Sequence, residues 1–129
     1  MRTCLLAGIA CLAACRPAVE DTPEAAYRAF AAAANHGEDK AAFARLTTRS
    51  QEALKARLSG LAAASGGAMK EDTSALMFHG GHGAPLTDVH LLKKDQDRAT
   101  VSVTAREQTR EVNLQREGTE WRVELPGLP

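Results

Sequence analysis

The chain has 129 residues, 16 basic and 16 acidic side chains, and three cysteines. This length accommodates one small domain, and the even charge balance argues against a dedicated nucleic-acid-binding protein, which usually carries a basic excess. With 44% apolar and 25% charged residues, the composition excludes a disordered chain. All three cysteines, Cys4, Cys11 and Cys15, lie near the N-terminus.

The N-terminal segment has the layout of a secretory signal. Arg2 precedes the uncharged stretch Cys4–Cys15, which is 12 residues long. A membrane-spanning helix needs roughly 20 residues, so this stretch has the length of a signal-peptide core instead. It ends in Leu12-Ala13-Ala14-Cys15, which resembles the lipobox of bacterial lipoproteins.

The lipobox resemblance implies how this segment is processed. A signal peptidase would recognise Leu12, Ala13 and Ala14 and cut before Cys15, whose sulfur would carry a diacylglyceryl group. Two or more acyl chains anchor a protein stably to a membrane. An ordinary signal peptide that happens to contain a cysteine is the alternative.

Processing at this position divides the chain into three parts. We expect a signal peptide over residues 1–14, a lipidated cysteine and short tether over 15–21, and a single domain over 22–126. The expected location is the bacterial cell envelope. Arg16 stands where an aspartate retains some lipoproteins in the inner membrane, so the periplasmic side of the outer membrane is favoured. The domain itself would contain no thiol or disulfide.

The first half of the domain predicts helices. Thr22 is a suitable cap and Pro23 a suitable first helical residue, and Asn35-His36-Gly37 should end this helix. A second, short helix is expected over Glu38–Leu46, with Phe43 and Leu46 facing the core.

A third helix should run to about Ala64, where Ser65-Gly66-Gly67 breaks it. Thr48 and Gln51 have the spacing of a capping box, with Ser50 as a rival cap. The apolar spacing along this helix predicts one inward-facing row formed by three leucines, Leu54, Leu58 and Leu61.

The second half predicts strands. Residues 66–86 form an irregular middle with a glycine-rich loop, after which apolar residues alternate with polar ones. Because the connections are short, the strands should form an antiparallel meander. The four expected strands cover Val89–Lys94 and Ala99–Ala105, include Val112 and Leu114, and end with Trp121–Leu125, with turns at 95–98, near 107–109 and at 117–119.

The fold class is therefore α+β, with three helices before a four-strand sheet. Residues 22–30, 37–46 and 120–125 carry a resemblance to the nuclear-transport-factor-2-like (SnoaL-like, cystatin-related) domains, in particular those of small bacterial lipoproteins of unknown function. The resemblance implies a cystatin-like α+β roll, in which the helices pack on a curved antiparallel sheet. It covers about residues 20–126 and rests on pattern more than on an invariant motif.

Enzymes of this superfamily, such as isomerases and dehydratases, line the cavity of the roll with an aspartate or histidine base and tyrosine donors. The matching residues here are Tyr27, the single tyrosine, and Asp88 with His90 at the first strand. Tyr27 suits core packing about as well. No charged residue interrupts the alternating apolar face of the second to fourth strands, which favours a domain without catalytic activity.

His79 and His82 lie in the glycine-rich loop and are the candidate metal ligands, with His90 and His36 elsewhere. The spacing fixes no third ligand, and a glycine loop does not hold ligands in place. A solvated turn with incidental histidines is the simpler interpretation. We therefore expect neither a metal nor another cofactor.

Basic-acidic neighbours recur in the strand region at Arg106-Glu107, Arg110-Glu111 and Arg116-Glu117. Such residues can form cross-strand pairs or a surface that docks a partner. The sequence thus favours a non-catalytic lipoprotein, anchored through Cys15, whose domain binds an envelope protein or a small ligand through the cavity of the roll or the sheet face. A small isomerase- or dehydratase-like enzyme is the alternative, and no nucleic-acid partner is expected.

Overall fold

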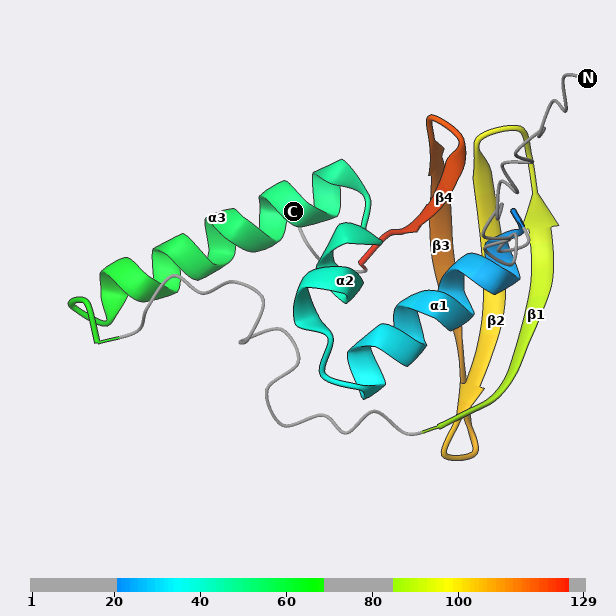
Figure 1. Cartoon of the computed structure of the whole chain (residues 1–129), viewed down its shortest axis with the longest axis horizontal. Helices are drawn as coiled ribbons and strands as arrows, with labels where there is room; N and C mark the ends of the chain where they lie inside the picture. Colours follow the sequence, from blue (N-terminus) through cyan, green and yellow to red (C-terminus); the bar gives the residue numbers. More distant parts are fainter. Residues whose placement is uncertain (1–20, 69–84, 126–129) are drawn as a thin grey trace, which may run out of the picture.

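The chain folds into three helices followed by a four-strand antiparallel open sheet, which confirms the α+β class (Figure 1). The computed structural model describes residues 21–68 and 85–125. The strands follow one another in the order β1-β2-β3-β4, as expected for a meander. Among the described helices, none has the length and apolar character needed to cross a membrane.

Helix α1 (Pro23–Asn35) begins and ends as its local sequence predicts. The Thr22 hydroxyl accepts a hydrogen bond from the Ala25 N–H at 3.2 Å, which satisfies one free donor of the first turn. At the other end His36 is the C-cap and Gly37 adopts a φ of 70°, a conformation that favours glycine.

Helix α2 (Asp39–Ala44) is shorter than the predicted range of 38–46. The chain leaves the helix at Arg45, and Leu46 forms a parallel bridge with Val123 of β4. The backbone carbonyl of Arg45 accepts from the Val123 N–H and the Thr47 N–H donates to the Val123 carbonyl, both at 2.9 Å. Leu46 is fully buried as expected, but in this added extended segment and not in a helix.

Helix α3 (Thr48–Ala64) has the expected length, but its predicted cap is wrong. Thr47 is the N-cap, and its hydroxyl accepts from the Ser50 N–H at 3.2 Å. Gln51 completes no capping box, because its side-chain amide donates to the carbonyls of Phe43 and Leu46 at 2.9 and 3.1 Å.

The inward face of α3 also differs from the prediction. Leu54 and Leu58 are buried as expected, whereas Leu61 is 46% exposed and Ala62 is buried in its place. Ala62 lies four residues after Leu58, so the buried residues of α3 keep the i, i+4 spacing along the helix. Leu61 lies next to this buried row and not in it.

The sheet consists of β1 (Leu86–Lys94), β2 (Arg98–Ala105), β3 (Gln108–Glu117) and β4 (Glu120–Val123). The β2–β3 turn lies at Arg106 and Glu107, slightly earlier than predicted, with φ angles of 49° and 62°. Two positive φ values are what a two-residue hairpin of right-handed twist requires.

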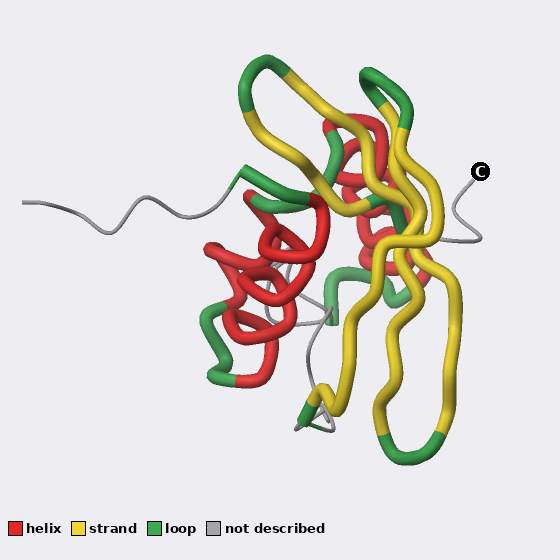
Figure 2. Tube along the Cα trace, turned by 90° about the vertical axis from the view of Figure 1, so that its right-hand side faces the viewer, coloured by secondary structure: helices red, strands yellow, loops and turns green. Residues whose placement is uncertain are grey.

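Helix α1 crosses one side of the sheet, which we call the inner face (Figures 1 and 2). Tyr27 and Phe30 of α1 belong to one core cluster with the inward side chains of the strands. The opposite, outer face carries hydroxyl and amide side chains, among which Thr100 bonds Asn113 and Thr104 bonds Thr109. The inward side chains of the strands include Val89, Ala99, Val101, Val103, Val112, Leu114, Trp121 and Val123.

Candidate functional site: a cleft between α1 and β4

A cleft of about 350 Å³ lies where the N-terminus of α1 meets β4 and the segment after α2. This volume is at the small end of the range for small-molecule sites. Its walls combine two arginines, two carboxylates, two threonine hydroxyls, an alanine and the single tryptophan, namely Asp21, Thr22, Ala26, Arg45, Thr119, Glu120, Trp121 and Arg122.

Trp121 lines the cleft and also belongs to the core cluster. It is 5% exposed, and its indole Nε1–H is buried without a hydrogen-bond partner in the described part of the chain. Lys94 Nζ and the Arg116 guanidinium each lie 5.7 Å from the ring centroid. A buried indole N–H normally has an acceptor, so this donor marks a place where an acceptor is missing.

The charges around the cleft are paired with one exception. Arg116 Nη2 contacts Asp21 Oδ2 at 2.7 Å, and Arg122 Nη2 lies 3.5 Å from Glu120 Oε2. Arg45 has no ion pair or side-chain hydrogen bond to any residue that the structure describes. Arg45 is therefore the charged side chain of the cleft lining without an ion pair among the described residues.

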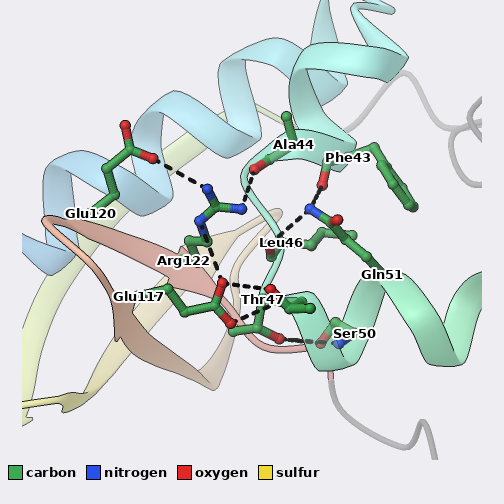
Figure 3. A network of polar contacts seen from close by, with 10 residues as sticks. Phe43, Ala44, Leu46, Thr47, Ser50, Gln51, Glu117, Glu120 and Arg122 are labelled. Atoms are coloured by element: carbon green, nitrogen blue, oxygen red, sulfur yellow. Dashed lines mark hydrogen bonds and ion pairs between the residues drawn. The ribbon is translucent and has the colours of Figure 1, made fainter.

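A polar network around Arg122 fixes one wall of the cleft (Figure 3). Arg122 Nη1 donates to the Ala44 carbonyl at 3.2 Å, and its Nε lies 3.6 Å from Glu117 Oε2. That separation is an ion pair rather than a hydrogen bond, which agrees with an Arg122 Nε that lacks a hydrogen-bond partner. The Arg122 side chain thereby ties β4 to the end of α2.

Of the predicted catalytic candidates, Tyr27 lies in the core. It is 2% exposed, packs against Phe30 at 5.9 Å between ring centroids, and accepts a hydrogen bond from Arg110 Nη2 at 3.1 Å. Arg110 on β3 is opposite Val103, whose side chain lies on the inner face of the sheet. The prediction that no charged residue interrupts the inner face is therefore wrong at Arg110. Glu111, its neighbour, is opposite Ser102 on the outer face, so the two do not share a charged face.

Asp88, the other candidate, is opposite Thr104, on the outer side of β1. Its carboxylate accepts from the Val89 N–H at 2.9 Å and pairs with His90 Nε2 at 2.5 Å. Tyr27 and Asp88 line neither this cleft nor a smaller one of about 200 Å³ at β2 and β3. The structure therefore does not bring them together.

The remaining predicted site residues lie outside the described ranges. These are the lipidation and cleavage residues Leu12, Ala13, Ala14 and Cys15, and the metal candidates His79 and His82. Within residues 21–68 and 85–125, no three histidine, cysteine or acidic side chains are grouped closely enough to hold a metal ion.

Sequence reasoning did not identify the cleft, because its parts come from separate segments. The usable signal was the single tryptophan in an alternating strand, since a buried indole N–H needs an acceptor. Nothing in the local sequence distinguishes Arg45 from the other arginines. Comparison of the chain with protein-family models, with curated proteins and with solved structures gives no match in any of the three.

Proposed function

We propose that this protein is a membrane-anchored envelope lipoprotein whose α+β domain binds a small ligand without catalysing a reaction. Binding is assigned to the cleft between α1 and β4, and anchoring to a lipid on Cys15. We also assign the domain to the cystatin-like α+β roll, on the basis of its three helices and four-strand meander.

The observation that carries the proposal is the guanidinium of Arg45, which lines the cleft without a partner among the described residues. A guanidinium can donate two parallel hydrogen bonds to one planar acceptor group of a ligand. The cavity of the roll itself is a weaker candidate, because Tyr27 and Phe30 of α1 pack in the core on the inner face.

A cleft-blocking variant tests the binding site. Ala26 is half-buried and lines the cleft, so Ala26→Leu places additional side-chain volume there. Ala32→Leu, on the exposed side of the same helix, is the matched control. A small-molecule library is screened by the change in Tm of the full-length protein. Compounds that stabilise the parent and Ala32→Leu, but not Ala26→Leu, support the proposal. Equal stabilisation of all three proteins contradicts it.

The anchor is tested separately by replacing Cys15 with serine. The parent protein should sediment with membranes and incorporate labelled fatty acid, because acyl chains supply about 0.8 kcal/mol per buried CH₂. Cys15→Ser should appear in the soluble or uncleaved fraction without label, and Cys11→Ser should behave as the parent. Unchanged labelling of Cys15→Ser contradicts the anchor.

A further inference from the structure

We propose that the ligand of the α1–β4 cleft is a small, singly charged carboxylate, bound through the guanidinium of Arg45 beside the side chain of Trp121. This inference rests on the proposed function and specifies its ligand class. It follows from Arg45, the charged residue of the cleft lining that has no partner among the described residues.

Arg45 and Thr22 supply hydrogen-bond donors to the cleft. Arg45 lines the cleft, and its side chain has no hydrogen-bond acceptor among residues 21–68 and 85–125. The Thr22 oxygen accepts from Ala25 N, so its O–H remains able to donate. A carboxylate accepts several hydrogen bonds and forms two with a guanidinium, which matches this group of donors.

Backbone hydrogen bonds fix the position of Arg45. Its backbone N–H donates to Ala42 at 3.1 Å and its carbonyl accepts from Val123 at 2.9 Å. The backbone of Arg45 is thus held against β4, whose residues form another part of the cleft wall. A charged group on a fixed backbone requires less ordering when it binds a ligand.

The charges of the cleft favour a ligand with one negative charge. Asp21 pairs with Arg116, and Glu120 shares Arg122 with Glu117, so Arg45 is the charged residue of the described lining that lacks an ion pair. One negative charge pairs with Arg45, whereas further negative charges would lie beside the carboxylates of Asp21 and Glu120. Lys94 and Arg116 beside the Trp121 ring disfavour a cationic ligand.

The test uses the full-length protein and the fluorescence of Trp121, which is the only tryptophan in the chain. The probes are butyrate, butyramide as its uncharged analogue, citrate as a multiply charged anion, and dimethyl phosphate as a model of a phospholipid phosphodiester. Butyrate should bind at least tenfold more tightly than each of the others. Arg45→Gln should weaken butyrate about tenfold, whereas Arg57→Gln, on the exposed surface of α3, should leave it unchanged.

The outcomes separate the ligand class from the binding site. Equal binding of butyramide and butyrate, with both lost in Ala26→Leu, overturns the carboxylate and leaves the cleft as the site. Tighter binding of dimethyl phosphate or citrate also overturns the carboxylate. If butyrate binds equally well to Ala26→Leu, or binds to none of the proteins, the ligand assignment fails, and the library screen decides independently whether the cleft binds another compound.

Discussion

The carboxylate of Glu117, at the end of β3, binds both the backbone N–H and the hydroxyl of Thr48, at 2.8 and 2.9 Å. Thr48 is the first residue of α3, so a strand supplies an acceptor to the positive end of a helix distant in sequence. The same carboxylate lies beside Arg122. Glu117 therefore connects α3 to the hairpin that forms one wall of the cleft.

Replacing Glu117 with alanine should lower the free energy of unfolding by about 1–2 kcal/mol, because two bonds to the helix start are lost. Urea denaturation followed by Trp121 fluorescence measures the change. Glu111→Ala on the same strand is the control, because Glu111 is exposed and has no described partner. Equal effects of the two substitutions would show that the contact contributes nothing specific.

Thr47→Ala should destabilise the protein more than Thr48→Ala. Thr47 is buried, caps α3, and also donates to Ser50 Oγ at 2.9 Å, so we expect a loss of about 1–2 kcal/mol. Thr47→Ser keeps the oxygen and should lose about 0.8 kcal/mol or less for the methyl group. The same denaturation assay ranks the variants, and a larger loss for Thr48→Ala would assign the cap to Thr48.

Leu58→Ala should cost about 2–5 kcal/mol, the range for truncating buried leucine side chains to alanine. Leu61→Ala should change stability by no more than about 0.5 kcal/mol, because Leu61 is nearly half exposed. Thermal or urea unfolding of both variants provides the comparison. Similar losses would mean that α3 packs along the row that the sequence predicted.

Tyr27→Phe should change the free energy of unfolding by less than about 1 kcal/mol, since Arg110, an exposed residue, is the partner of the hydroxyl among the described residues. Tyr27→Ala removes a buried ring and should cost about 3–5 kcal/mol. Small-ligand binding by Tyr27→Phe should equal that of the parent protein. Loss of binding with unchanged stability would instead place Tyr27 in the site.

These contrasts show which features a sequence can predict. The start of α1 depends on Thr22 and Pro23, which act within one turn, and both were predicted correctly. The cap of α3 was misassigned because Thr47 and Thr48 both suit a cap locally, and the distant Glu117 occupies Thr48. The end of α2 likewise depends on a bridge to Val123 in the last strand.

The cleft could not be predicted for the same reason. Thr22, Arg45 and Trp121 come from three segments that only the folded chain brings to one wall. The pairing of Asp21 with Arg116 decides which arginine stays without a partner. Alternating apolar residues predicted a buried Trp121, but the absence of an acceptor for its N–H is a property of the assembled core.

The indole N–H resonance of Trp121 gives the most direct measurement, because one tryptophan produces one such signal. Addition of a ligand that binds in the cleft should shift this resonance, because the Trp121 side chain lines the cleft. Arg45→Gln should require about tenfold more butyrate for the same shift. An indole resonance that stays unchanged while a ligand saturates the protein would contradict the assignment of the cleft as the binding site.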